Sequence, residues 1–552
     1  MSERVDSVAM SVNSVVPRAT TVSLSWLRSR DQAGAVVAAG LLLFAAVWLA
    51  HLSYTSLSPP TDNIEQLTWL HSLEWGYYKH PPLPTWLIWM PAQWFGANAW
   101  TSYVTGAAFT LGSMGLLWKL LSRLRGNRYA ALALLAVLCI TYYNGRLYYF
   151  NHNVVLMLFA TASLTLCWKA HSTAQLRWWA ALGVALGLGA LAKYQIAVTM
   201  ASVLVFWLNQ RGWRDARQRS GLLLAALIVL LALTPHLLWL RTHDFGPVDY
   251  ARQSSLGAHL DTATRWADAL HWVVDQVLNR ALPAWLLIVA ALYLKRRNAG
   301  PRALRSPATI SPRTRDPVRA LLLSWGLVPL AFMPMVGILS GAELQLHWGT
   351  PFLLFAVPAA MELFSARVDW QRVPLRPTVN SFLAIQALLL VLSHVTSPRG
   401  PQALRDPHWR TFDSEALAKL LEEPARQALP GGAICVVSGA GAPAGALALQ
   451  LADRPLVLIN GRFDHSPWVS IDEVKGCGML ELKEGLPLPG DRPVGPQFPQ
   501  LSWRIVQPEA TWTWTADART GVGTASSPRA DHGSVAALSQ HVRGAGLPGS
   551  LP

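Results

Sequence analysis

Charged residues are scarce in this chain of 552 residues, and that scarcity excludes a soluble protein. Only 14% of the residues are Asp, Glu, Lys or Arg, whereas 52% are hydrophobic and 26 are Trp. The apolar residues gather in repeated runs of about twenty, the length that crosses a bilayer as a helix. The composition therefore predicts an α-helical polytopic membrane protein.

Cysteine is also rare, with four in the chain. Cys139 and Cys167 lie in apolar runs, and Cys435 and Cys477 lie in the polar C-terminal part. No pair has the close spacing of a zinc knuckle. In an oxidising compartment Cys435 and Cys477 could form a disulfide, although a buried free thiol would also suit a strand at Cys435.

The start of this sequence does not predict a cleavable secretory signal. Residues 1–32 are polar and contain four Arg, whereas a signal peptide would place a short apolar core there, followed by small residues. We predict that residues 1–32 are a cytoplasmic segment and that the first apolar run stays in the membrane as an anchor.

The apolar runs predict about eleven transmembrane helices, give or take two. They lie near residues 33–54, 98–118, 129–147, 153–168, 178–192, 195–209, 220–240, 273–294, 320–339, 349–365 and 378–396. With the N-terminus inside, the inner segments hold 25 Lys and Arg and the outer loops seven, as the positive-inside rule requires. Loop charge of this kind explains the net charge of +15, and no nucleic-acid partner is expected.

The first outer loop, about residues 55–97, carries the most unusual polar residues. It contains the segment Asp62-Asn63-Ile64-Glu65-Gln66 and then the aromatic segment Trp75-Gly76-Tyr77-Tyr78-Lys79-His80-Pro81-Pro82-Leu83-Pro84. Interfacial Trp, Tyr and Lys anchor many membrane helices without any other role. Charges beside the hydrocarbon layer are costly, however, and are usually retained for a function.

Other polar residues fall on the same predicted outer face. They are Asn151, His152 and Asn153 at the start of the fourth span, Lys193 between the fifth and sixth, and Arg241 after the seventh. For each residue alone, a hydrogen bond to a neighbouring helix or snorkelling is the simpler explanation. Their shared sidedness favours a functional site.

These segments resemble the polytopic lipid-linked-sugar glycosyltransferases, which include the protein O-mannosyltransferases and the bacterial aminoarabinose transferases. An Asp and a Glu soon after the first span, followed by an aromatic segment closing in Lys-x-Pro-Pro-Leu, are similar to that group's first external loop. Weaker likeness extends over about the first two thirds of the chain through Phe150-Asn151-His152-Asn153, Leu191-Ala192-Lys193-Tyr194, Pro235-His236-Leu237-Leu238-Trp239 and Trp348-Gly349-Thr350-Pro351. Two departures concern the aminoarabinose transferases: Asn63 stands where they carry a second acid, and His80 separates the Lys from the prolines.

The resemblance implies an enzyme of the bacterial inner membrane that moves a sugar from a polyprenyl-phosphate donor, most simply with inversion. The acceptor would be a hydroxyl or phosphate of a lipid, a glycan or a protein on the outer face. Such transfer needs a base, cations for the leaving phosphate and aromatic surface for the sugar. No cofactor is predicted, and a divalent metal is compatible with these residues.

We assign roles to the polar residues on this basis. Asp62 is the candidate base, and Glu65, which would lie one turn on if this segment were helical, either shares that role or orients Asp62. Lys79, then Lys193 and Arg241, are the candidate ligands of the donor phosphate. The candidates for sugar or acceptor binding are Trp75, Tyr77, Tyr78, His80, Asn151 and Asn153.

Two other functions share these features. A transporter of lipids or lipid-linked sugars would bind a headgroup with intramembrane charges, but the sequence lacks the inverted repeats of such transporters. A polymerase or ligase of surface polysaccharide would use the same donor and differ only in its acceptor.

Turn residues and charge return after about residue 398. The run 433–437 and the run 455–459 predict strands, and an Ala- and Leu-rich helix lies between them. The glycines Gly439, Gly441 and Gly445 do not have dinucleotide-binding spacing, so tight packing explains them better. We predict a small α/β domain over residues 398–515, outside the membrane and over the mouth of the site, and a disordered tail over residues 516–552.

Overall fold

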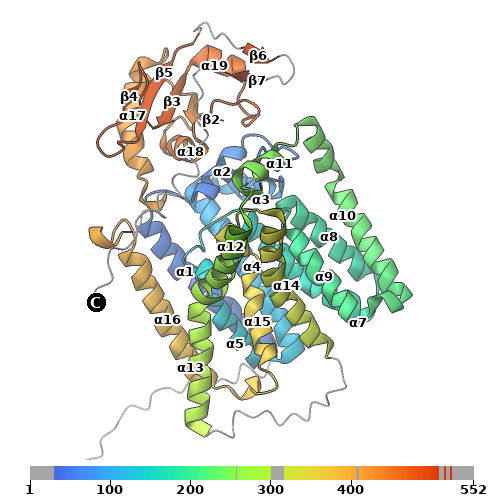
Figure 1. The fold of residues 1–552 in the computed structure, drawn as a ribbon. Coiled ribbons are helices and arrows are strands. Elements are labelled where there is room, and N and C mark those ends of the chain that lie inside the picture. Colours follow the sequence, from blue (N-terminus) through green and yellow to red (C-terminus); the bar gives the residue numbers. More distant parts are fainter. Residues whose placement is uncertain are drawn as a thin grey trace, which may run out of the picture.

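The computed structural model describes residues 30–256, 258–299, 316–405, 409–485, 487–508, 515–517 and 522–524. A bundle of helices fills most of it, and a small α/β domain sits at one end of the bundle (Figure 1). The predicted fold class, a helical membrane protein with a C-terminal α/β domain, is confirmed.

In the described part of the chain, six helices are long and apolar enough to cross a membrane. They are α1 (Arg30–Thr55), α4 (Ala99–Arg125), α7 (His152–Thr173), α10 (Ala216–Thr242), α14 (Pro317–Ser340) and α16 (Leu375–Val395). A seventh would be the broken pair bent by 50°, in which α12 (Thr262–Val274) and the π-turn η4 (Asp275–Arg280) precede α13 (Leu282–Ala299).

Shorter apolar helices account for the remaining predicted spans. They are α5 (Asn127–Leu138), α8 (Leu176–Ala192), α9 (Ile196–Asn209) and α15 (Ala356–Leu363), which follows the 3-10 turns η6 (Leu346–Gly349) and η7 (Leu353–Phe355). Each of the eleven predicted segments overlaps a helix in the described residues. The number of complete crossings stays a prediction.

Two predicted spans are shorter as helices than their apolar runs. The run 129–147 is helical only to Leu138, then turns and continues as the short α6 (Thr141–Asn144), and the run 349–365 begins with 3-10 turns. The Tyr143 hydroxyl donates to the Thr350 carbonyl at 2.8 Å and accepts from the Leu354 amide at 2.9 Å. The Tyr143 hydroxyl thus pairs with a backbone carbonyl and a backbone amide of the second irregular segment. In a regular helix these two groups would have bonded to other backbone groups.

Small residues let the helices approach closely. A Cβ on Gly183 of α8 would lie 2.8 Å from the Ala225 carbonyl oxygen of α10, and one on Gly187 would lie 2.8 Å from the Ala232 Cβ. An added methyl group would overlap the facing helix at both positions, so these two glycines allow α8 and α10 to pack closely.

The first outer loop is largely helical, which the sequence reading did not predict. It contains α2 (Thr61–Trp69), which follows Pro60, and α3 (Leu83–Phe95), which follows two prolines. Asn63 is fully buried, donating to Ser102 Oγ at 2.8 Å and to the Tyr148 carbonyl at 2.9 Å, and accepting from the Phe150 amide at 2.9 Å. Asn63 therefore fixes α2 against α4 and against the chain that leads into α7.

The C-terminal domain has a five-stranded mixed sheet in the order β2-β1-β3-β5-β4. Its strands are β1 (Val436–Gly439), β2 (Leu456–Ile459), β3 (Met479–Glu484), β4 (Arg492–Pro493) and β5 (Leu501–Val506), and its helices are α17 (Ser414–Ala428), α18 (Gly441–Gln450) and α19 (Ile471–Cys477). β1 pairs in parallel with β2 and β3, and β5 pairs antiparallel with β3 and β4. The short strands β6 (Thr515–Asp517) and β7 (Val522–Thr524) fall in or beside the predicted tail, whose other residues lie outside the described residues.

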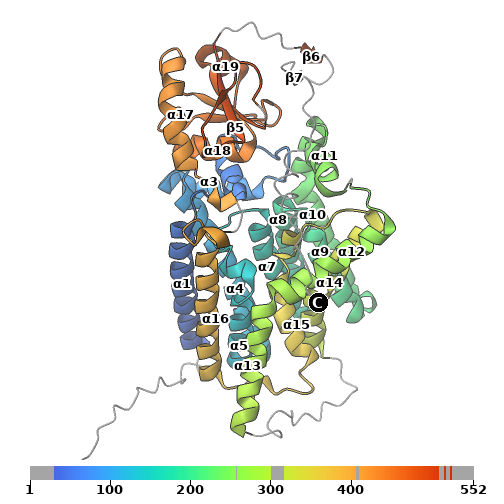
Figure 2. The same ribbon diagram turned by 60° about the vertical axis from the view of Figure 1, so that its left-hand side comes forward.

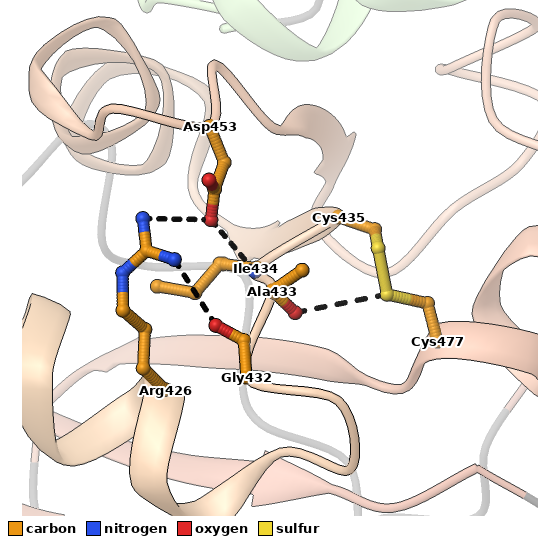
Figure 3. The surroundings of a disulfide bond; sticks show 7 residues. All are labelled: Arg426, Gly432, Ala433, Ile434, Cys435, Asp453 and Cys477. Atoms are coloured by element: carbon orange, nitrogen blue, oxygen red, sulfur yellow. Dashed lines mark hydrogen bonds and ion pairs between the residues drawn. A yellow bond between two sulfur atoms is a disulfide. The ribbon is translucent and has the colours of Figure 1, made fainter.

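A disulfide joins Cys435, just before β1, to Cys477 at the end of α19 (Figure 3). Beside it, Asp453 accepts from the Ile434 amide at 3.0 Å and pairs with Arg426 at 2.9 Å. A cross-link over 42 residues restricts the unfolded chain and stabilises the folded domain by up to about 4 kcal/mol.

The α/β domain packs directly on the first outer loop (Figures 1 and 2). Trp69 of α2 and Tyr77 are 0% and 3% exposed and belong to the hydrophobic core of the α/β domain. Gly445 of α18 lies against α2, where an added Cβ would be 2.5 Å from Ile64 Cγ2. The glycine-rich turn thus serves close packing, and α2 is held from both sides.

We expect Gly445→Ala to loosen this contact, because the new methyl group would overlap Ile64 of α2. Overpacking of this kind typically costs 1–3 kcal/mol, roughly. Gly476→Ala in α19 is the matched control, since nothing lies within 4 Å of its added Cβ. Thermal unfolding in detergent should show a lower Tm for the first variant alone, and equal Tm values would contradict the contact.

Candidate functional site

Asp62 lies in the first turn of α2, half-buried at the outer end of the bundle. Its Oδ2 accepts a hydrogen bond of 2.8 Å from the side-chain amide of Asn151. Asn151 is the N-cap of α7 and uses its own oxygen to accept from the Val154 amide at 3.0 Å. The start of α7 therefore holds the Asp62 carboxylate in place.

Two cations lie near this carboxylate. Lys193, in the turn between α8 and α9, donates to Asn153 Oδ1 at 2.7 Å, and Arg146 precedes α7. The Arg146 guanidinium lies 5.5 Å from the centre of the Tyr149 ring. Both cations interact electrostatically with Asp62. The arrangement gives an acid and two cations on one face, as transfer from a phosphate requires.

Burial lowers the pKa of Lys193 to about 8, and the nearby charge of Asp62 opposes that shift. Asn153 is the hydrogen-bond partner of its ammonium group. Lys193 is therefore a cation at neutral pH that loses its charge under mildly alkaline conditions.

Glu65 and Lys79 form an ion pair of 2.5 Å, with side chains 16% and 24% exposed. The Lys79 ammonium also lies 5.4 Å from the ring centre of Tyr78 and 5.3 Å from that of Tyr250. Burial acts to lower the pKa of Lys79, but the charge of Glu65 outweighs it and the pKa lies well above its ordinary value. Glu65 therefore neutralises Lys79, which leaves Asp62 as the better candidate base.

Two histidines lie beside this ion pair. The rings of His80 and His152 are 4.0 Å apart between centroids. Burial, together with nearby His152 and Lys193, lowers the pKa of His80 well below its ordinary range, so its imidazole is neutral. Glu65, His80 and His152 offer metal-ligating atoms that all lie within 4.8 Å of one another.

The predicted sugar platforms have different surroundings. Tyr77 is buried and stacks on Trp69 at 4.5 Å, so its assignment to sugar binding is wrong: its ring belongs to the core. Trp75 is 46% exposed and packs edge-on against Trp86 at 4.8 Å. Tyr78 lies beside Lys79 and stacks on His465 of the α/β domain at 4.0 Å. Tyr78 is therefore the aromatic candidate nearest the ion pair.

Arg241 is not brought to the cluster. It is exposed in the last turn of α10, and no hydrogen bond or ion pair joins its side chain to another residue of the described chain. Arg241 was assigned as a phosphate ligand only because it falls on the predicted outer face. That argument gives the face on which a residue lies but not its position within the face.

The sequence reading missed Arg146, Tyr250 and His465 as neighbours of the site. The sequence does give a signal for Arg146, which is one of the seven Lys and Arg of the predicted outer loops and lies only a few residues before Asn151. Tyr250 in α11 (Gly246–Ala251) and His465 between β2 and α19 reach the site through tertiary contacts. No local pattern distinguishes them.

Comparisons with known proteins agree with this architecture. The family model of dolichyl-phosphate-mannose-protein mannosyltransferases matches residues 79–239, which include Lys79, Arg146, Asn151, Asn153 and Lys193. A curated relative, the undecaprenyl phosphate-alpha-4-amino-4-deoxy-L-arabinose arabinosyl transferase 1 of Pseudomonas fluorescens (strain Pf0-1), is 27% identical over 332 residues. The match covers 57% of this chain and 54% of the relative, so the chain spans about half the length of that protein.

Solved structures of ArnT from Cupriavidus metallidurans share the fold. The structure bound to undecaprenyl phosphate aligns with a TM-score of 0.52 and 16% identity, over 81% of this chain and 93% of that one. The apo structure aligns with a TM-score of 0.54 and 14% identity, over 85% and 98%. The shared fold, the family match over residues 79–239 and the curated relative confirm the predicted resemblance to the polytopic lipid-linked-sugar glycosyltransferases.

Proposed function

We propose that this protein transfers a sugar from a polyprenyl-phosphate donor to an acceptor on the outer face of a bacterial inner membrane. The observation that carries the proposal is the Asp62 carboxylate, held by Asn151 and interacting with the cations Lys193 and Arg146. The ArnT structure that shares the fold was solved with undecaprenyl phosphate bound, which supports a donor of this class.

In the proposed reaction the acceptor oxygen attacks the anomeric carbon of the sugar, with inversion. The bond between that carbon and the phosphate oxygen breaks, and polyprenyl phosphate leaves with the electron pair. Asp62 accepts the proton of the acceptor hydroxyl, because Asn151 occupies only one of its carboxylate oxygens among the described residues. Lys193 and Arg146 stabilise the charge that develops on the phosphate.

The site would face the outside of the membrane with the N-terminus in the cytoplasm. The excess of Lys and Arg in the predicted inner segments supports this orientation. The α/β domain packs on the loop that carries Asp62 and Tyr78, which supports a role for the domain in presenting the acceptor.

The experiment that tests the proposal uses the full chain in proteoliposomes with a panel of radiolabelled polyprenyl-phosphate sugars. Release of unlabelled polyprenyl phosphate together with labelled acceptor is the expected result. The lipid, protein and glycan fractions would be separated, and the fraction that carries the label would identify the class of the acceptor. Movement of intact labelled lipid across the bilayer without cleavage would instead establish a transporter.

A further inference from the structure

Glu65, His80 and His152 come from three separate segments and meet at one point. Glu65 belongs to α2, His80 lies in the loop before α3, and His152 is the first residue of α7. One oxygen or ring nitrogen from each lies within 4.8 Å of the others. Two imidazoles and one carboxylate form a donor set that catalytic zinc sites use, with a further coordination position left open.

The second nitrogen of His152 points to a missing partner. His152 is 4% exposed, and its Nε2 has no hydrogen-bond partner within the described chain. The ring also hydrogen-bonds to the backbone of Pro81, which assigns its other nitrogen, Nδ1, to that contact. Because proline has no N–H, Nδ1 must donate to the Pro81 carbonyl and so carries the proton of the neutral ring. Nε2 therefore carries a lone pair that no donor binds. Metal-bound histidines usually donate their second ring N–H to a backbone carbonyl or carboxylate, as this arrangement allows.

The rings of His80 and Trp69 both lie beside the His152 ring. The His80 ring is 4.0 Å from that of His152 and tilted by 42°, and Trp69 lies edge-on to His152 at 6.0 Å. A buried acceptor with no donor costs about 1–3 kcal/mol, so the folded chain has a reason to bind something there. A cation coordinated by both imidazoles would remove that cost.

Lys79 already pairs with the carboxylate that such a cation would bind. Its ammonium lies 2.5 Å from Glu65 Oε2 and supplies the positive charge that the carboxylate needs. A metal ion would compete with this ammonium for Glu65. Metal binding would then release Lys79 to a phosphate oxygen, the role predicted for Lys79 from the sequence.

We propose that Glu65, His80 and His152 bind a divalent transition metal of the zinc class in competition with Lys79. Both imidazoles bind as neutral ligands and Glu65 as a carboxylate, so no redox step is involved. This proposal does not depend on which sugar or which acceptor the protein uses.

The first test is Zn²⁺ titration of the full-length protein in detergent after removal of metal, in competition with a chromophoric chelator. We expect one Zn²⁺ per chain and nitrogen and oxygen ligands in the zinc X-ray absorption spectrum. His152→Ala should weaken binding by more than the roughly 10–100-fold that loss of an outer-shell partner costs. His171→Ala, at the other end of the same helix α7, is the matched control and should bind as the parent does.

The second test removes the competing cation. Lys79→Met should tighten Zn²⁺ binding by about tenfold or more, because Glu65 is then free to ligate; tenfold corresponds to about 1.4 kcal/mol. Misfolding would weaken Zn²⁺ binding, whereas Lys79→Met is expected to tighten it. A gain in affinity therefore cannot be caused by misfolding. Absence of Zn²⁺ binding in the parent, equal binding in His152→Ala, or an unchanged affinity in Lys79→Met would each overturn the proposal.

Discussion

Replacing Asp62 with Asn is expected to reduce sugar transfer by roughly 10²–10⁴-fold, the range that a general base contributes. Asn keeps the size of Asp and can still accept the hydrogen bond that Asn151 donates, so α2 should stay in place. What the variant loses is the ability to take the proton of the acceptor hydroxyl. The measurement is the initial rate of transfer in proteoliposomes, with binding of labelled donor measured beside it.

Asp244→Asn is the matched control for this variant. Asp244 is exposed after α10, and its left-handed backbone (φ 48°) is one that Asn adopts readily. Its transfer rate should equal that of the parent. If Asp62→Asn retains the parent's rate while Glu65→Gln loses it, the base is Glu65 and its ion pair with Lys79 opens during the reaction.

Replacing Lys193 with Met is expected to reduce transfer by about 10²–10³-fold, because a fixed cation then no longer opposes the charge on the leaving phosphate. The Asn153 oxygen that now accepts from Lys193 would also lose its donor. The measurement is kcat for a saturating labelled donor. Lys169→Met is the control, because Lys169 lies at the other end of α7 over the ring of Trp178. Equal losses in the two variants would contradict the role of Lys193.

The pH profile gives Lys193 a second, independent test. The protonated form is the one that can stabilise phosphate, and burial lowers the pKa of Lys193 to about 8. Transfer should therefore be full below pH 8 and fall as the pH rises through that value. Lys193→Arg keeps its charge to much higher pH, so its profile should stay flat across this range. A parent profile that does not fall above pH 8 would exclude Lys193 as the titrating cation.

The helices could largely be predicted from the sequence because each one depends on a local property. A run of apolar residues long enough to cross a bilayer is readable without tertiary information. The prediction erred where tertiary bonds replace helical ones, as at Tyr143, whose hydroxyl bonds to Thr350 and Leu354. It also missed α2 and α3, because the sequence reading treated the polar and proline-rich stretch between spans as a loop.

The candidate site could be predicted only in part. The prediction of a shared outer face grouped Asp62, Asn151, Asn153 and Lys193, and in the structure hydrogen bonds join Asn151 to Asp62 and Lys193 to Asn153. The same reasoning placed Arg241 there, because an outer-face position does not fix the position within that face. It also overvalued Tyr77, since an aromatic residue near a membrane surface can pack in a core as readily as it can face a sugar.

The sequence by itself determined the membrane class of this protein, its predicted spans and the residue types that a phosphate-linked transfer needs. Composition and the length of apolar runs act locally, so they can be read along the chain. Only the tertiary structure decided which of those residues meet: Glu65 pairs with Lys79, His80 reaches His152, and the α/β domain brings His465 to Tyr78. These contacts join segments far apart in the chain, and the packing of α2 between the helix bundle and α18 sets them.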